Sequence, residues 1–382
     1  MKINAFLGSG VSVPSQLPTV HVLTPMVLRT DAGMGPDTKR ACAFLSLLEA
    51  YETADKLRGG LFETRGGIKA SGAIYRSGKT TYEDLYFLCD QIFAWANGLA
   101  DNAQTTAFVE AIERRAGDLL DGKTHEQRMY QLGKLGRVGR ELIQTVVAKE
   151  LRKPYVTGLG LLSEMAQDAG VEELDVVTLN HDTLLEQHLD ARGIEYADGF
   201  GERDGDVRWS DTDVFDQPGV NVRVLKLHGS INWYSFLQSG SARAAIRTDK
   251  EGDCVCDRNG EILTPAVTGP AFLTGIGKAI SYNRSIYSDI HLRFQMLLRQ
   301  TKRIVMSGYG WGDAAINFQL ESWLDRSSDN KLILLHRETD ELLKNSLTMD
   351  AGFAAWVRLG RIVPIEKWMC ETTLQDIRAE LV

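Results

Sequence analysis

Several side chains that can support chemistry stand directly after short apolar runs of this sequence. They are a hydroxyl, an amide, an imidazole and carboxylates, contributed by Ser9, Asn180, Asp182, His228 and Asp313. An unperturbed imidazole changes charge near neutral pH and can take up a proton, while an amide or a carboxylate can orient a water or favour a nearby cation. These types predict a site that binds a ligand and moves a proton, provided that the fold brings them together.

The first of these residues lies in a glycine-rich turn near the N-terminus. The apolar run at 3–7 leads directly into Gly8-Ser9-Gly10. This order predicts a buried strand, a phosphate-binding turn and then the start of a helix, whose free N–H groups favour anions. The dinucleotide fingerprint has a third glycine and Val13 stands in its place, so an ordinary strand-to-helix turn remains the alternative.

The other polar side chains follow further strand-like runs. Strands are predicted at 174–179, 222–227, 303–307, 331–335 and 361–364, with helices ending near 191, 300 and 325. The carboxyl ends of parallel strands share one edge of a sheet, where ligands bind. The pattern therefore predicts an α/β fold, namely a Rossmann-like doubly wound parallel sheet with a large helical insertion. The stretches 198–220 and 238–281 are expected to be loop and irregular chain.

The insertion is predicted from the helical spacing of apolar residues between 21 and 170. Helices are expected near 38–57, 103–119, 125–151 and 156–168, with one more opened by a capping box at Thr80 and Glu83. Glycines at 133, 136 and 139 interrupt one of these helices, which indicates either close helix packing or a weaker helix.

Two regions of chain follow from these patterns. The core is expected to be discontinuous, formed by residues 1–20 and 171–382, and residues 21–170 form a mostly helical insertion or lid. That insertion either covers the core or roofs a ligand cleft, and the sequence does not separate these two alternatives.

Composition limits the classes of protein that need consideration. The chain has 382 residues, of which 43% are hydrophobic and 25% charged, as in ordinary globular proteins. Its formal net charge of -8 argues against a basic face that wraps nucleic acid, so no direct nucleic-acid binding is expected. No apolar run reaches the ~20 residues that span a bilayer, and no signal-peptide pattern is present. These observations predict a cytoplasmic protein without a membrane partner.

The cysteines predict the absence of a structural metal. There are five, an odd and scattered set that is typical of reduced thiols. Only Cys254 and Cys256 are close together, and no second pair completes a site with four ligands. No zinc is therefore expected.

Four short motifs, taken together, resemble the sirtuin (silent information regulator) family. In chain order they are Gly8-Ser9-Gly10-Val11-Ser12 with Leu17-Pro18-Thr19, Thr178-Leu179-Asn180-His181-Asp182, Leu227-His228-Gly229-Ser230, and Ser307-Gly308-Tyr309-Gly310 with Asp313. The family shows a glycine turn with a following Ile/Leu-Pro, a T-x-N-x-D strand end, a catalytic histidine before glycine and a glycine-serine-rich turn. The likeness covers residues 3–20 and about 171–340.

The resemblance departs from the sirtuin deacylases in two respects. The chain cannot build their zinc module of four cysteines, and its last motif is closer to the sirtuin-like domains of bacterial anti-phage proteins, which hydrolyse NAD. The resemblance therefore implies an NAD glycohydrolase that takes NAD as its substrate and acts as an anti-phage effector. The alternatives are an NAD-dependent protein deacylase or ADP-ribosyltransferase, and a non-catalytic subunit that senses NAD or ADP-ribose.

The resemblance also implies a role for each matching residue. Asn180 would hold a water or the nicotinamide ribose, Asp182 would hold the carboxamide or favour a cationic ribose, and His228 would take a proton. The residues expected to bind NAD are Gly8, Ser9, Gly10, Ser12, Pro18, Thr19, Thr178, Ser230, Gly308, Tyr309, Gly310 and Asp313. The phosphates are expected at the first turn and the adenosine half near the last.

Simpler roles remain open for the same residues when each is taken alone. Asn180 and Asp182 are good helix caps, His228 could be a turn histidine, and Tyr309 could be a core aromatic. An unrestrained NAD hydrolase would harm its host, so a homo-oligomer and a controlling partner are expected. The resemblance suggests a HerA-type ATPase or an Argonaute-like protein as that partner.

Overall fold

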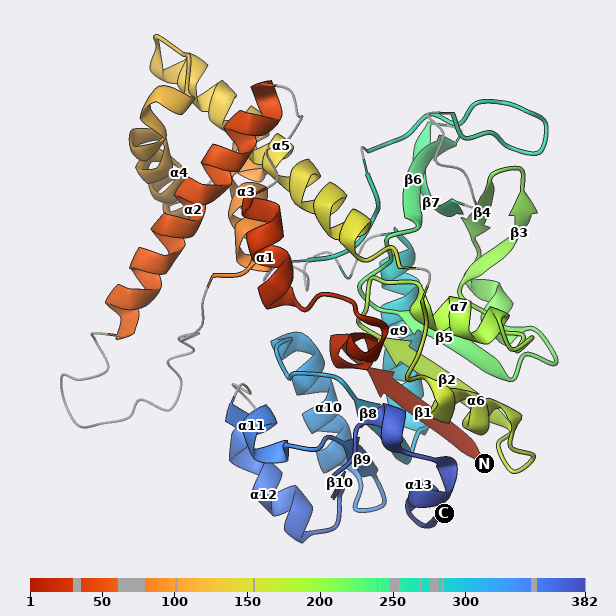
Figure 1. The fold of residues 1–382 in the computed structure, drawn as a ribbon. Helices are drawn as coiled ribbons and strands as arrows, with labels where there is room; N and C mark the ends of the chain where they lie inside the picture. Colours follow the sequence, from red (N-terminus) through yellow and green to blue (C-terminus); the bar gives the residue numbers. More distant parts are fainter. Residues whose placement is uncertain are drawn as a thin grey trace. The chain divides into compact units, whose positions relative to one another are not determined.

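The computed structural model describes residues 1–29, 36–60, 80–99, 102–153, 155–238, 240–247, 254–267, 269–274, 282, 285–344 and 349–381 (Figure 1). The chain forms two compact units. The first contains Met1–Thr19, Leu151–Leu273 and Ala279–Val382, and the second contains Val20–Glu150 with Thr274–Lys278.

The first unit is built on a parallel sheet of six strands. They are β1 (Lys2–Leu7), β2 (Glu173–Thr178), β5 (Val222–Lys226), β8 (Arg303–Ser307), β9 (Lys331–Leu335) and β10 (Ile362–Ile365). Their order is β10-β9-β8-β1-β2-β5, and every neighbouring pair is parallel. This is the doubly wound parallel sheet that the sequence predicts, with the strand order now given by the structure. The chain winds outward from β1 in both directions, so the switch point lies between β1 and β8.

The strand register brings the predicted motifs to one level. Leu7 on the central strand pairs with Thr178 on one side and with Ser307 on the other. Thr178 pairs in turn with Lys226. The residues that follow these strand ends therefore emerge together at the carboxyl edge.

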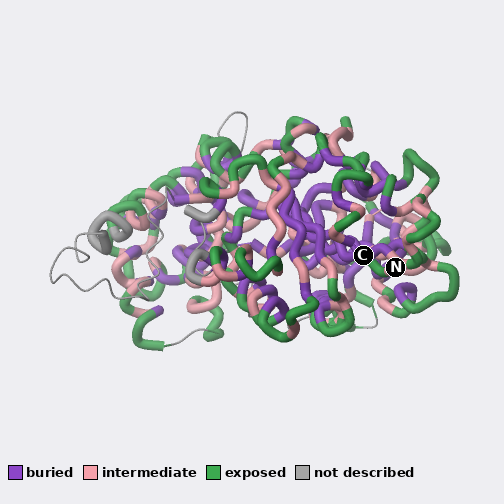
Figure 2. The backbone as a smooth tube through the Cα atoms, turned by 90° about the horizontal axis from the view of Figure 1, so that it is seen from below, coloured by how far each residue is buried: buried purple, intermediate pink, exposed green. Residues whose placement is uncertain are grey.

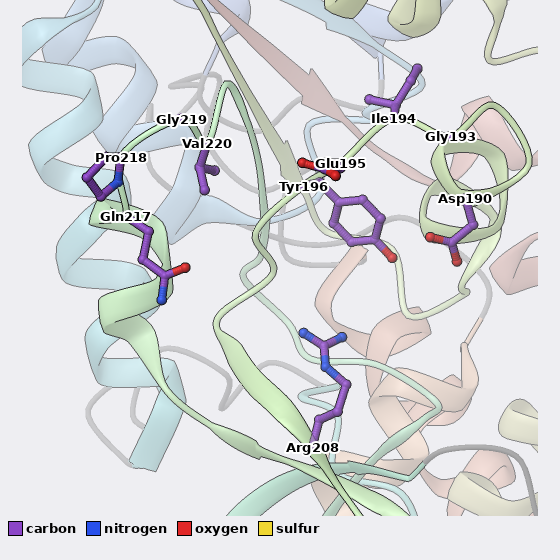
Figure 3. Close-up of a pocket in the computed structure, with 10 residues that line it drawn as sticks. All are labelled: Asp190, Gly193, Ile194, Glu195, Tyr196, Arg208, Gln217, Pro218, Gly219 and Val220. Atoms are coloured by element: carbon purple, nitrogen blue, oxygen red, sulfur yellow. The ribbon is translucent and has the colours of Figure 1, made fainter.

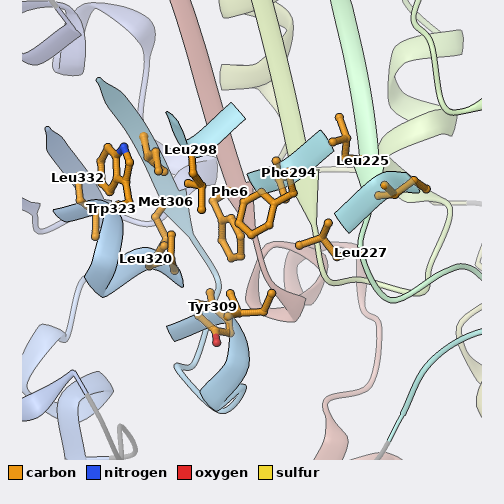
Figure 4. Close-up of a cluster of buried hydrophobic side chains, with 14 of the residues drawn as sticks. Phe6, Leu225, Leu227, Phe294, Leu298, Met306, Tyr309, Leu320, Trp323 and Leu332 are labelled. Atoms are coloured by element: carbon orange, nitrogen blue, oxygen red, sulfur yellow. The ribbon is translucent and has the colours of Figure 1, made fainter. Parts of the chain in front are cut away.

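Helices cover both faces of this sheet, as a parallel sheet requires. They are α6 (Gly160–Gln167), α7 (Leu184–Asp190), α9 (Ser285–Gln300), α10 (Ala314–Arg326), α11 (Thr339–Lys344), α12 (Asp350–Arg358) and α13 (Leu374–Leu381). On one face, Phe6 and Met306 pack with Phe294 of α9 and Trp323 of α10 (Figure 4). β1, which begins at the marker N in Figure 2, is buried from Ile3 to Leu7, so its opposite face is covered as well.

A second sheet of four antiparallel strands was not expected from the sequence. It contains β3 (Phe200–Asp204), β4 (Val207–Ser210), β6 (Trp233–Gln238) and β7 (Ser241–Arg247), in the order β3-β4-β7-β6. The predictions of loop at 198–220 and irregular chain at 238–281 are therefore wrong at these strands. The strands are short and partly exposed, and β4 pairs with the distant β7, so their pattern is weak within any local window.

The second unit is helical among its described residues. Its helices are α1 (Val20–Arg29), α2 (Pro36–Gly60), α3 (Tyr82–Ala96), α4 (Ala103–Ala116) and α5 (His125–Glu150), with a short 3-10 turn at Gly117–Leu119. The glycines of α5 mark close helix packing. A Cβ at Gly136 would lie 2.9 Å from the Cys89 carbonyl oxygen of α3, and one at Gly139 would lie 2.8 Å from the Cys89 sulfur.

Two local predictions are wrong in detail: the position of the capping box of α3, and the type of helix that follows the glycine turn. The capping box of α3 is formed by Thr81 and Asp84 rather than by Thr80 and Glu83, because Thr81 is the residue with extended backbone before the helix. The segment after the glycine turn is a 3-10 helix, η1 (Ser9–Ser15), which ends at Gln16 in a left-handed conformation.

Candidate functional site

The two glycine turns of the sheet edge interlock at the switch point. The Gly8 N–H donates to the Ser307 carbonyl at 3.0 Å, and the Gly10 N–H donates to the Gly308 carbonyl at 2.9 Å. A Cβ at Gly8 would lie 2.5 Å from the Gly308 oxygen, and one at Gly308 would lie 2.4 Å from the Val11 nitrogen. Gly308 also has a φ of +68°, which side chains rarely adopt. The turns therefore need glycine in order to pack against each other.

Ser12 connects this turn to the end of β2. Its hydroxyl donates to Asp182 Oδ2 at 2.7 Å and accepts from Asn180 Nδ2 at 3.1 Å. All three residues are buried. The sequence predicts these side chains for one site, and the structure brings them together although Ser12 is about 170 residues away from the others.

Asn180 carries a feature that a helix cap does not explain. Its amide nitrogen is used by Ser12, and its backbone N–H donates to Thr178 Oγ1 at 3.1 Å. The amide oxygen Oδ1 is buried and has no hydrogen-bond partner in the described part of the chain. Buried oxygens of this kind are uncommon in native proteins and often mark a place for a water or a ligand. The helix α7 is instead approached by Asp182, whose Oδ1 accepts from the Leu184 N–H at 3.1 Å.

Lys226 supports Asp182 from the end of β5, and the sequence analysis did not single it out. The ammonium group is almost completely buried, donates to the Asp182 carbonyl and pairs with Glu186 Oε1 at 2.8 Å. Burial raises the pKa of the Asp182 carboxyl, while Lys226 and the Ser12 hydroxyl act to lower it. A lysine that ends a buried apolar run is the signal that could have revealed this residue, because buried lysines are rare unless paired.

The space among these polar groups is small. A cavity of about 10 Å³ is lined by Ser12, Thr178, Asn180, Asp182 and Lys226, among other residues. This is close to the volume that one water needs. A larger ligand would therefore meet this group of side chains from outside rather than enter among them.

His228 lies in the loop after β5, two residues beyond Lys226, and its imidazole belongs to a second polar group. Its Nε2 is 3.0 Å from the Tyr282 hydroxyl and 3.2 Å from Asp313 Oδ2. The Tyr282 hydroxyl itself donates to Asp313 Oδ2 at 2.9 Å. Tyr282 could not be identified from the sequence, because it stands in no periodic pattern or motif.

The two groups lie near each other at the carboxyl edge. The ring of His181, directly after Asn180, has its centroid 6.2 Å from that of His228. His181 packs against Phe272 at 4.6 Å, and its carbonyl accepts from the Ser230 hydroxyl. Ser230 is fully buried, and its hydrogen bond to His181 links the loop after β5 to the loop after β2.

In the last motif, Tyr309 is buried in the core and Gly310 is exposed. The Tyr309 ring packs edge-on against Phe6, and its hydroxyl donates to Asn317 Oδ1 at 2.7 Å. Burial raises the pKa of Tyr309 well above its ordinary value. Gly310 is exposed in the same turn. The Tyr309 side chain therefore contributes to the hydrophobic core, as a core aromatic would.

The remaining predicted residues lie around the first turn. Ser9 and Gly10 are exposed, whereas Gly8 is buried behind them. Pro18 is partly buried and Thr19 is exposed, at the end of the first segment of this unit.

A separate pocket lies away from this edge (Figure 3). It has a volume of about 860 Å³ and is lined by Asp190, Gly193, Ile194, Glu195, Tyr196, Arg208, Gln217, Pro218, Gly219 and Val220. Val220 precedes β5, so the pocket lies near the amino end of that strand. Arg208 is already held by both carboxylate oxygens of Asp198 at 2.8 Å.

Among the residues that the structure describes, no group of three or more His, Cys, Asp or Glu side chains is placed to hold a metal ion. Cys254 is exposed and Cys256 partly buried. None of the helices in the described segments is both long and apolar enough to cross a membrane.

Comparison with known families agrees with the motifs. Residues 175–354 match the model of the SIR2-like domain family. This range contains Asn180, His228 and Asp313 but not the N-terminal turn that packs against Gly308. The resemblance to sirtuins is thereby confirmed over the matched residues.

Two further comparisons concern curated proteins and solved structures. No curated protein matches the chain. Among solved structures, a Sir2 homologue in complex with NAD is similar, at 12% identity and a TM-score of 0.38, over 100% of this chain and 91% of that one. A mutant Sir2 homologue in complex with 2′-O-acetyl ADP-ribose has 13% identity and a TM-score of 0.37, over 100% and 93%.

Proposed function

We propose that this protein binds NAD and hydrolyses it to nicotinamide and ADP-ribose. The observation that carries the proposal is the position of Asn180 and His228 at one carboxyl edge, beside the switch point where glycine turns meet. Ligands of doubly wound folds bind at such a switch point. The match of residues 175–354 to the SIR2-like domain supports the choice of an NAD-using site.

The proposed reaction breaks the bond between the nicotinamide nitrogen and the ribose C1′. The electron pair leaves with nicotinamide, the ribose passes through an oxocarbenium-like state, and water attacks C1′. The unpartnered oxygen Asn180 Oδ1 would hold that water or a ribose hydroxyl, and His228 would accept the proton that the water loses. One water is consumed and one proton is released for each NAD.

Asp182 would act mainly through its neighbours. Both of its carboxylate oxygens already accept hydrogen bonds, from Ser12 and from the Leu184 N–H. In this proposal it holds Ser12, which in turn aims the Asn180 amide. The exposed Ser9 and Gly10 would face the pyrophosphate, with Pro18, Thr19, Thr178, Ser230 and the Gly308–Gly310 turn as further cofactor contacts.

One incubation separates this function from its alternatives. Purified protein is mixed with NAD, with and without an acylated peptide, and nicotinamide and ADP-ribose are separated by chromatography. Release of both without peptide is expected. Release only with peptide would instead indicate a deacylase or transferase. Calorimetric binding without turnover would indicate a sensor, and absence of both binding and turnover would overturn the proposal.

The biological role in this proposal is anti-phage defence by depletion of cellular NAD. It rests on the likeness of the last motif to sirtuin-like domains of anti-phage proteins. Control would come from a homo-oligomer or from a partner such as a HerA-type ATPase or an Argonaute-like protein. Sedimentation is expected to show an oligomer, and a fully active monomer would refute this control. NAD levels in infected cells, with and without the intact gene, test the defence role.

A further inference from the structure

Two side chains from separate segments, Tyr282 and Asp313, meet at the imidazole of His228. His228 lies two residues after β5, Asp313 precedes α10, and Tyr282 lies between β7 and α9 in the sequence. Their polar atoms form a triangle. The Tyr282 hydroxyl is 3.0 Å from His228 Nε2 and 2.9 Å from Asp313 Oδ2, and His228 Nε2 is 3.2 Å from Asp313 Oδ2. All three sides are within the range of hydrogen bonds or close ion pairs.

The proton count of this triangle decides which atom donates. An ionised carboxylate only accepts, and the single hydroxyl proton of Tyr282 is directed to Asp313 Oδ2. The imidazole Nε2 therefore faces two oxygens that can accept from it. This arrangement favours an imidazole that carries hydrogen on Nε2, and it stabilises the positively charged form of the ring.

The two partners of His228 are themselves fixed. Asp313 Oδ1 accepts from the N–H groups of Ala315 and Ile316, at 3.1 and 3.2 Å, so the carboxylate is anchored at the start of α10. The Tyr282 ring stacks on His291 with centroids 3.7 Å apart. His291 Nε2 in turn lies 3.0 Å from the Leu227 carbonyl.

The other titratable groups that face His228 do not supply this charge. His291 has its pKa lowered to about 4 by burial, so it is neutral at physiological pH. His181 lies beyond hydrogen-bond range by its ring separation of 6.2 Å. Among the described groups around the ring, Asp313 is the carboxylate paired with it.

We propose that Asp313 and Tyr282 are positioning residues for His228, setting its orientation and stabilising the charge that it acquires when it takes up a proton. The inference rests on the proposed function and deepens it, because it assigns a carboxylate–histidine pair to the proton acceptor. It places Asp313 beside the imidazole, whereas the sequence analysis expects it in the adenosine half. Aspartate plays the corresponding part in other enzymes that use histidine as a base.

The decisive variant is Asp313→Asn. Asparagine caps helices as well as aspartate does, so α10 keeps its N-terminal hydrogen bonds while the charge is lost. The kcat for NAD cleavage is expected to fall on the order of 10²-fold or more, with KM and melting temperature nearly unchanged. Tyr282→Phe is expected to lower kcat by roughly tenfold, as for the loss of one hydrogen bond to a charged group.

A second measurement reports on the pair without turnover. Ring nitrogen shifts of the seven histidines are followed by NMR against pH, and the His228 signal is assigned with a His228→Gln variant. The protonated ring is expected to persist to higher pH in the wild-type protein than in Asp313→Asn. The matched control is Asp211→Asn, which changes a surface aspartate that caps a 3-10 helix and should alter neither readout.

The outcomes are distinct. Unchanged titration of His228 in Asp313→Asn would overturn the positioning role, as would a loss of activity that merely follows a lower melting temperature. If the wild-type protein does not cleave NAD but the titration shifts, the pairing holds and the proposed function fails.

Discussion

The two polar groups at the carboxyl edge differ in how their hydrogen bonds are completed. Around Ser12, one buried oxygen, Asn180 Oδ1, has no partner in the described part of the chain. Around His228, the imidazole, the Tyr282 hydroxyl and the Asp313 carboxylate contact one another. The first group thus leaves one buried acceptor unpartnered among the described residues, whereas the imidazole of the second is held by two neighbours. The difference suggests one group that orients a reactant and one that receives its proton.

The largest expected effect is on the second group. His228→Ala should lower the rate of nicotinamide release by about 10²–10⁴-fold, since a positioned base contributes that much. His228 is buried and contacts Tyr282 and Asp313, so a loss of about 1–3 kcal/mol of stability is expected as well, and turnover is compared at a temperature where both proteins are folded. The exposed His125→Ala serves as the control. Cleavage at the wild-type rate would remove the proposed mechanism.

Asn180→Ala tests the first group in the same assay. A similar order of loss is expected if the amide positions the water, together with the modest loss of stability that its hydrogen bond to Ser12 contributes. A helix cap would behave in the opposite way, losing about 1 kcal/mol of stability and keeping turnover. Stability loss without activity loss would assign Asn180 to structure alone.

The junction of the glycine turns should respond through stability. Gly308→Ala forces a side chain onto a φ of +68° and into the Val11 nitrogen, so a loss of roughly 1–3 kcal/mol or more is expected. Gly310→Ala is the matched control, since a Cβ there meets nothing within 4 Å. Equal melting temperatures of the two variants would contradict this packing. Gly10→Val, at 2.7 Å from Gly308 Cα, should likewise destabilise the turn before any effect on phosphate binding.

Ser12→Ala tests whether the first polar group contributes to both stability and turnover. The Asp182 oxygen and the Asn180 amide each lose a partner, so about 1–3 kcal/mol of stability should be lost together with part of the turnover. Ser15→Ala removes a hydroxyl from the same 3-10 helix, where it donates to the Thr157 carbonyl at 3.0 Å. It should cost stability but leave kcat unchanged. If Ser12→Ala and Ser15→Ala have equal kcat values, Ser12 takes no part in the reaction.

The smallest expected effect is a change of stability with pH. It is caused by His188, which belongs to neither polar group. Burial lowers the pKa of His188 to about 4, below the usual 6.5. The unfolded chain therefore binds more protons between these values, and stability should fall as pH falls from about 6.5 to 4. His188→Gln should flatten this decline in urea unfolding measured across that range. An unchanged slope would assign the decline to other groups, such as His291.

Much of the fold could be predicted from the sequence, because short stretches of chain carry the patterns that are typical of its strands and helices. The buried strands of the parallel sheet are short continuous apolar runs, and β1, β2, β5, β8 and β9 lie within a residue or so of the predicted ranges. The helices of the insertion likewise follow from the spacing of apolar residues. The antiparallel sheet was missed, because the partly exposed strands at 207–210 and 241–247 acquire their pattern only from each other.

For the candidate site, the sequence by itself determined which chemical types are present and that they follow strand ends. Ser12, Asn180, Asp182 and His228 could be named from that rule together with the resemblance. Only the tertiary structure decided their partners. Lys226 under Asp182, Tyr282 beside His228 and the contact of Asp313 with the imidazole join residues 44 to 85 positions apart. Such contacts depend on strand order and register, which are set by packing across the whole sheet and leave no trace in a local pattern.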